Sequence, residues 1–164
     1  MNEKIALLVL MTFLSTCVQA QNFLEDNKIE LGVRTSTSIQ SLSIIFSANA
    51  RMQLEVGTVE AIISPWSDRF VITGLFAAHD SDFLKKQYSG ALEGFSYFFG
   101  LGGHLGTSYS DFLSGVDVQA GMEYKIPSLP LKVSTDLKPA YHITGPVEIN
   151  KFELQGGASI RYVF

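Results

Sequence analysis

Apolar and polar residues alternate along the last stretch of the chain, residues 152–164. The even positions are Phe152, Leu154, Gly156, Ala158, Ile160, Tyr162 and Phe164. The odd positions are Glu153, Gln155, Gly157, Ser159, Arg161 and Val163. Successive side chains of a β-strand point to opposite faces, so this period of two predicts a strand with one apolar and one polar face. The segment is also about as long as a tilted strand needs to be to cross a bilayer.

Similar segments precede it. They lie at residues 28–35, 39–47, 52–61, 69–78, 95–105, 116–126 and 129–143. The segment 69–78 is apolar on both faces, so its phase stays open. Helices are disfavoured because apolar residues spaced by two would scatter around a helix, and glycine is frequent within the segments. Segments of about ten residues between turns are typical of membrane-spanning barrels. The fold class we predict is all-β, an eight-stranded antiparallel up-and-down transmembrane β-barrel.

The N-terminus has the pattern of a cleaved signal peptide. A short charged start is followed by an apolar run at residues 5–14 and by small or polar residues ending in Ala20. This pattern predicts a signal peptide at residues 1–20 and one barrel domain at residues 21–164. The stretch before Cys17 also resembles a lipoprotein processing site, although it has Thr16 where that pattern has a smaller residue. Lipidation of Cys17 is therefore an alternative.

Composition narrows the classes of partner. Acidic residues outnumber basic residues by 16 to 12, and the formal net charge is −4. Without a basic run, we do not expect binding to nucleic acid. Charged residues make up 17% of the chain, below the roughly 25% of soluble domains. No cysteine follows the predicted cleavage site, so no disulfide framework is expected.

An even number of strands places both ends of the barrel domain on the periplasmic side. The predicted periplasmic connections are residues 47–51, 78–94 and 127–129, and the outward ones are 36–40, 63–68, 106–115 and 144–151. Residues 83–86 are expected to form a helical turn. Pro139 cannot donate to a sheet ladder, so we place it at the outer rim, at a β-bulge.

The chain resembles a known family in several places. Its end, with Ala158, Ile160, Tyr162 and the terminal Phe164, is similar to the last strand of bacterial outer-membrane barrels. Residues 73–79, 121–127, 136–140 and 159–164 resemble small eight-stranded proteins of the OmpA-like barrel class, in an uncharacterised subgroup. That subgroup has a leucine-tyrosine-glutamate turn, where this chain has Phe76 and Ala77 after Leu75.

The resemblance implies a location in the bacterial cell outer membrane of a Gram-negative organism. The implied partners are outer-membrane lipids, lipopolysaccharide and the barrel assembly machinery, which reads the last strand. The residues that would carry this assembly signal are Ile160, Tyr162 and Phe164. The resemblance does not imply any particular activity, because that subgroup has no settled one.

No catalytic, cofactor-binding or metal-binding residues are expected. His79, His104 and His142 are dispersed and lack cysteine or carboxylate neighbours at ligand spacing. His104 and His142 have the inward phase, so we expect them to be hydrogen-bonded inside the barrel. The run 100–106 is rich in glycine but lacks the spacing of a dinucleotide-binding fingerprint.

The main candidate site is a set of charged residues at strand positions whose side chains would point into the barrel. Its members are Glu30, Arg34, Glu55, Asp117, Glu123, Lys132, Asp136, Lys138, Glu153 and Arg161. The interior of an eight-stranded barrel is only just wide enough for side chains, and confined charges must pair. We expect Arg161 near Glu30, and Arg34 near Glu55 or Glu153. A gated ion path through the same charges is the alternative.

The function expected is non-enzymatic, structural or partner-anchoring, with the lumen closed by this polar network. Two alternatives stay open. One is an enzyme that modifies outer-membrane lipids. The other is a soluble ligand-binding barrel like a lipocalin, which would have its apolar face inward.

Overall fold

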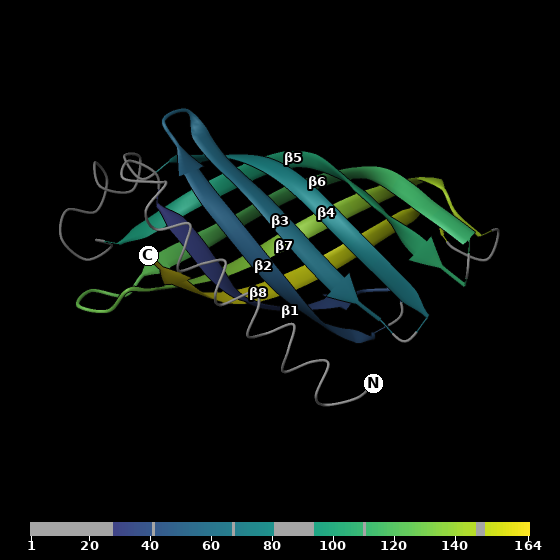
Figure 1. The fold of residues 1–164 in the computed structure, drawn as a ribbon, viewed down its shortest axis with the longest axis horizontal. Coiled ribbons are helices and arrows are strands. Elements are labelled where there is room, and N and C mark those ends of the chain that lie inside the picture. Colours follow the sequence, from purple (N-terminus) through teal and green to yellow (C-terminus); the bar gives the residue numbers. More distant parts are fainter. Residues whose placement is uncertain (1–27, 41, 67, 81–93, 110, 147–149) are drawn as a thin grey trace.

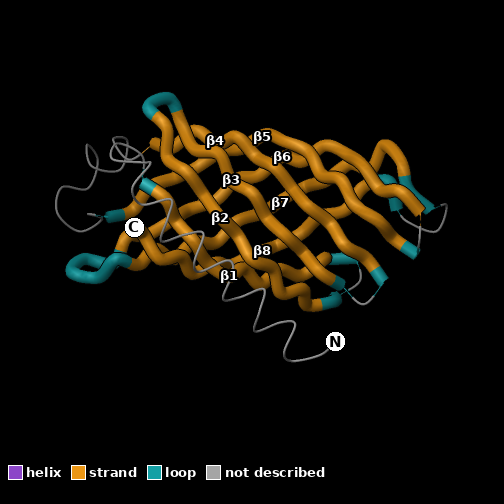
Figure 2. The backbone as a smooth tube through the Cα atoms, viewed as in Figure 1, coloured by secondary structure: helices purple, strands orange, loops and turns teal. Residues whose placement is uncertain are grey.

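The computed structural model describes residues 28–40, 42–66, 68–80, 94–109, 111–146 and 150–164, and these form a closed barrel (Figures 1 and 2). The strands are β1 (Ile29–Ser38), β2 (Ile44–Leu54), β3 (Gly57–Pro65), β4 (Arg69–Asp80), β5 (Phe95–Ser108), β6 (Asp111–Lys125), β7 (Leu131–Thr144) and β8 (Phe152–Val163). Each strand pairs antiparallel with the next, and β8 closes the barrel on β1. The prediction of an all-β, eight-stranded antiparallel barrel is confirmed.

The barrel has two ends. The β2–β3 and β6–β7 connections lie at the same end of the barrel as the C-terminus (Figure 1), where the backbone N–H of Phe164 donates to the carbonyl of Ile29 (2.9 Å). The opposite end carries the β1–β2, β3–β4, β5–β6 and β7–β8 connections (Figure 1). The predicted signal peptide and the predicted helical turn at 83–86 lie outside the described residues.

Burial alternates along the strands as the sequence pattern requires. In β8, Glu153, Ser159 and Arg161 are buried, whereas Ile160 and Tyr162 are exposed. The sequence left open which face of β4 points inward. In the structure Thr73, Leu75 and Ala77 face inward. None of the described residues forms a helix long and apolar enough to cross a membrane.

The boundary between β2 and β3 differs from the prediction. Residues 47–51 were expected to form a connection, but they lie in the middle of β2. The turn falls instead at Glu55 and Val56, inside the segment 52–61 that was expected to be one strand. Short residues such as Ala48 and Asn49 have weak strand propensity, so they resemble a turn in the sequence although they continue the alternation.

The connection between β5 and β6 is also shorter than predicted. Residues 106–115 were expected to be a loop, but the paired strands continue to Ser108 and resume at Asp111. Tyr109 begins this tight connection with a positive φ of 49°. Gly106, Ser108, Ser114 and Gly115 therefore belong to strands, where pairing on both sides overrides their local preference.

Pro139 lies within β7 and not at a bulge. It pairs with Leu154 of β8, while the β6–β7 ladder is interrupted between the Asp117–Ala140 and Ala120–Leu137 pairs. The missing N–H of Pro139 is thus accommodated by a local gap on the β6 side. The register shift lies elsewhere, between Ser114 and Gly115 of β6.

Candidate functional site: the polar interior

The interior of the described barrel is filled largely by polar and charged side chains. The buried charged residues are Glu30, Arg34, Arg51, Glu60, Asp117, Glu123, Asp136, Lys138, Glu153 and Arg161. Buried charges are costly unless they are paired and hydrogen-bonded. Their contacts divide them into three groups along the barrel.

The basal cluster lies toward the C-terminal end. It consists of Glu30, Arg51, Glu60, Glu123, Lys132 and Arg161. Arg161 donates from Nε to Glu30 (3.0 Å) and from Nη2 to Glu123 (3.1 Å). Arg51 donates from Nη1 to Glu123 (2.6 Å) and from Nη2 to Glu60 (2.7 Å). Three carboxylates thus face three cations, so the cluster is neutral as a unit.

Neutral side chains add further hydrogen bonds to the basal cluster. Asn49 donates from Nδ2 to Glu60 (2.9 Å), and the hydroxyl of Ser134 accepts from Arg161 Nη1 (3.0 Å). The guanidinium of Arg51 also lies over the ring of Phe98, 5.0 Å from its centroid. Each of these two guanidinium groups bridges two carboxylates, which fixes geometry as well as charge.

A second group lies farther along the barrel, where Arg34 of β1 pairs with Asp136 of β7. The pair is bidentate, with Arg34 Nη2 2.7 Å from Asp136 Oδ1 and a second bond from Nη1. It reaches across β8 above Gly157, where a Cβ atom would lie only 2.2 Å from Arg34 Nη2. The absence of a side chain at Gly157 therefore leaves the space that the ion pair fills.

The third group, toward the opposite end, is a histidine chain: Asp117, His104, His142 and Glu153. Asp117 Oδ2 lies 2.8 Å from His104 Nδ1, and His104 Nε2 lies 2.9 Å from His142 Nδ1. His142 Nε2 lies 3.3 Å from Glu153 Oε2. The other oxygen of Asp117 accepts from Lys138 Nζ (3.2 Å).

The structure places all the predicted inward charges in the barrel interior except Glu55. That residue lies exposed in the β2–β3 turn, so its predicted inward position was wrong. The predicted contact between Arg161 and Glu30 is confirmed. The predicted partners of Arg34, Glu55 or Glu153, were also wrong, because Arg34 pairs with Asp136. His104 and His142 face inward and are hydrogen-bonded, as predicted.

Arg51 and Glu60 were missed by sequence reasoning. Arg51 fell in the expected connection 47–51, and Glu60 had the outward phase of a continuous strand 52–61. The turn at Glu55 and Val56 reverses that phase and turns Glu60 inward. The sequence did contain a signal for Arg51, because Ile45, Asn49 and Arg51 share one phase of the alternation in β2.

The outer wall carries the predicted assembly-signal residues. Ile160, Tyr162 and Phe164 are 54%, 46% and 44% exposed, and the last two rings pack edge to face with centroids 4.8 Å apart.

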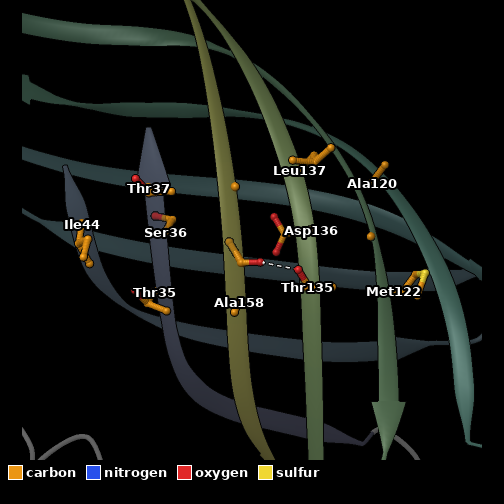
Figure 3. A pocket seen from close by; sticks show the side chains of 13 residues that line it. Thr35, Ser36, Thr37, Ile44, Ala120, Met122, Thr135, Asp136, Leu137 and Ala158 are labelled. Atoms are coloured by element: carbon orange, nitrogen blue, oxygen red, sulfur yellow. Dashed lines mark hydrogen bonds between the residues drawn. The ribbon is translucent and has the colours of Figure 1, made fainter. Parts of the chain in front are cut away.

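A depression of about 630 Å³ also lies on this wall, where small side chains of β1 and β8 adjoin Leu137 and Met122 (Figure 3). Thr135 at this depression donates its hydroxyl to the carbonyl of Gly157 (3.1 Å).

Two cavities lie at the mouths of the described barrel. One of about 590 Å³ opens at the C-terminal end beside His79, Ser96 and Lys132, and one of about 30 Å³ lies beside the histidine chain. Among the described residues, no group of three or more histidine, cysteine, aspartate or glutamate side chains could hold a metal ion. The side chains of the described interior form ion pairs and hydrogen bonds.

Comparison with protein-family models found no match for this chain, and comparison with curated proteins found no similar sequence.

Proposed function

We propose that the chain is a non-enzymatic integral outer-membrane protein, a structural or partner-anchoring component whose lumen is closed by a polar side-chain network. One observation carries this proposal: the barrel buries most of the charges on its strands and exposes many of its large apolar residues. Val33, Phe46, Ile44 and Ile143 are 65%, 73%, 66% and 64% exposed, whereas Glu30, Arg51 and Arg161 are almost completely buried. Soluble proteins rarely expose extensive apolar surface.

Hydrocarbon is the solvent that suits this surface. A closed barrel pairs its backbone groups between strands, so no sheet edge would face lipid. The apolar residues of the wall would then contact acyl chains, which favours insertion by about 25 cal/mol for each Å² removed from water. The ion-paired interior is shielded from lipid by the same wall.

The alternatives receive less support. A lipocalin-like protein needs an apolar interior cavity for its ligand, but the described interior is occupied by paired charges. An enzyme of outer-membrane lipids needs its catalytic histidine at the lipid-facing rim. His104 and His142 lie in the interior, and His79 contacts Thr58 and Glu123 at the C-terminal mouth.

The proposed partners follow from the outer wall and the last strand. Outer-membrane lipids and lipopolysaccharide would surround the apolar wall. The barrel assembly machinery would bind β8 through its exposed aromatic edge, which includes Tyr162 and Phe164. The predicted signal peptide would deliver the chain to the periplasm.

Cell fractionation combined with gel electrophoresis tests this proposal. We expect the protein in the outer-membrane fraction, and folded material should migrate differently in SDS before and after boiling. Recovery in the soluble periplasm, with the same mobility under both conditions, would contradict the proposal.

The lipid composition of a deletion strain should equal that of the wild type, and a changed lipid A or phospholipid profile would favour the enzyme alternative.

A further inference from the structure

The histidine chain brings four titratable side chains from four consecutive strands into one line. His104 comes from β5, Asp117 from β6, His142 from β7 and Glu153 from β8, and all four are buried. His104 and His142 both pair with Gly115 of the strand between them. A Cβ atom at that glycine would lie 2.7 Å from His104 Nε2, so the glycine leaves the space in which the two rings meet. The ring centroids are 4.8 Å apart.

The geometry of the histidine chain sets the number of protons that its hydrogen bonds need. Its three contacts are Asp117 to His104, His104 to His142, and His142 to Glu153. Each contact is a hydrogen bond only when one proton lies between its two heavy atoms. Two neutral imidazoles supply only two N–H groups. With both carboxylates ionised, one contact would therefore set a nitrogen lone pair against another acceptor.

We propose that His104 and His142 share one additional proton, which makes the histidine chain a proton-binding site inside the barrel. Three protons on the four ring nitrogens satisfy all three contacts. The positive charge can move between the rings: the N–H bond on His104 Nε2 breaks as one forms on His142 Nδ1, across 2.9 Å. No other bond changes, and the outer nitrogens keep their protons toward Asp117 and Glu153.

The surrounding charges allow the proton to leave as well as to bind. Lys138 of β7 contacts Asp117, and Arg69 of β4 lies 4.0 Å from Glu153, so two cations already balance the two carboxylates. The remaining residues that line the cavity beside the site are uncharged, such as Ile45 of β2 and Ser64 of β3. Binding the third proton gains a hydrogen bond but adds a charge, and the two effects oppose each other.

A route for the proton lies beside the site. The cavity of about 30 Å³ at this end is lined by His104, His142, Glu153 and Arg69. It can hold a water molecule among several polar partners. Arg69 is partly exposed, with 21% of its side chain accessible, so the cavity lies close to the surface of the opposite end.

Nitrogen NMR of the histidine rings tests the proposal in the folded, purified barrel. The ring ¹⁵N shifts report how many nitrogens carry a proton, and they are followed between about pH 4 and pH 9, where histidine titrates. Single His104→Gln and His142→Gln variants assign the signals. We expect three protons on the pair over an interval of this range, and both rings should change together as the shared proton is lost.

Glu153→Gln provides the decisive variant because it keeps the shape of the side chain. Its amide can donate to His142 Nε2, so two protons on the ring nitrogens are then enough for all three hydrogen bonds of the histidine chain. We expect the pair to lose its third proton at the pH where the wild type holds it. His79→Gln is the matched control at the other end of the barrel, and it should leave the pair unchanged.

Two results would overturn the proposal. One is a pair of neutral histidines that titrate independently in the wild type. The other is a Glu153→Gln variant that folds, as judged by its circular dichroism, and titrates like the wild type. If Glu153→Gln does not fold, Asp117→Asn gives a second comparison at the other end of the histidine chain, because its amide can donate to His104 Nδ1 and the pair then needs only two protons. The proton count depends on the folded barrel and not on its location, so it stands apart from the membrane proposal.

Discussion

At the scale of single residues, the barrel interior depends on matched charges. The basal cluster sets Glu30, Glu60 and Glu123 against Arg51, Lys132 and Arg161. Removing one member leaves an unequal number of charges in a closed space. Such a loss costs more than the pair contributes, because the remaining charge stays buried without its partner.

Arg161→Ala should therefore destabilise the barrel strongly. It removes hydrogen bonds to Glu30, Glu123 and Ser134 and leaves three carboxylates facing two cations. We expect a loss of about 3–5 kcal/mol in the free energy of unfolding, measured by urea titration in lipid vesicles. The exposed Lys125 provides the control, since Lys125→Ala should change stability by less than about 0.5 kcal/mol. Equal effects of the two substitutions would refute the structural role of the cluster.

Gly157→Ala should destabilise the barrel through Arg34. The new methyl group would lie 2.2 Å from Arg34 Nη2, so the guanidinium would have to leave its bidentate contact with Asp136. Overpacking of this kind costs about 1–3 kcal/mol. The neighbouring Gly156→Ala is a matched control, because its nearest heavy atom is Leu137 Cδ2 at 3.9 Å. Urea unfolding that shows the same stability for both variants would contradict this account of Gly157.

At the scale of strands, the clarity of the alternation decided what the sequence could predict. In most of β8, and in β6 from Val116 onward, apolar and polar residues alternate, and the inward positions of Glu153, Arg161 and Asp117 followed directly. Strand number and order followed as well. The local pattern did not reveal the turn at Glu55 and Val56, since it is only two residues long and no proline marks it.

The partners of the inward charges depended on distances around the barrel. Arg34 and Asp136 are separated by 102 positions in the chain and by β8 in space. Alternation gives the face of each residue but not its height relative to strands that are not its neighbours. The contact of Arg161 with Glu30 was predictable because β1 and β8 must pair to close the barrel.

The last strand makes a separate prediction about assembly. Removing Phe164, or changing both Phe164 and Tyr162 to serine, should block insertion, because these exposed aromatic residues form the end of β8 that the assembly machinery is proposed to bind. The amount of protein in the outer membrane, measured by immunoblot, should fall at least about tenfold. This corresponds to a loss of about 1.4 kcal/mol in binding to the assembly machinery. Phe112→Ser, also on an exposed aromatic residue but in β6, is the control and should assemble. Normal levels of the truncated protein would exclude this role.

At the scale of the whole molecule, the barrel is closed by its own side chains. The basal cluster, the Arg34–Asp136 pair and the histidine chain occupy successive levels of the interior. An eight-stranded barrel leaves little room beyond such side chains. We therefore expect almost no ion current through the protein in planar bilayers. A large and steady single-channel current would instead favour the gated ion path.

The most direct test of the central claim, that the apolar wall faces lipid, uses spin labels on single cysteines. The only cysteine of the chain, Cys17, lies in the predicted signal peptide, so the remaining barrel accepts a unique label. Labels at Val33 and Ile160 on the outer wall should collide often with oxygen, which dissolves in hydrocarbon, and rarely with a water-soluble nickel complex. A label at Val56 in the β2–β3 turn should show the reverse. If the wall labels collide with the nickel complex as often as the turn label does, the wall faces water and the account is wrong.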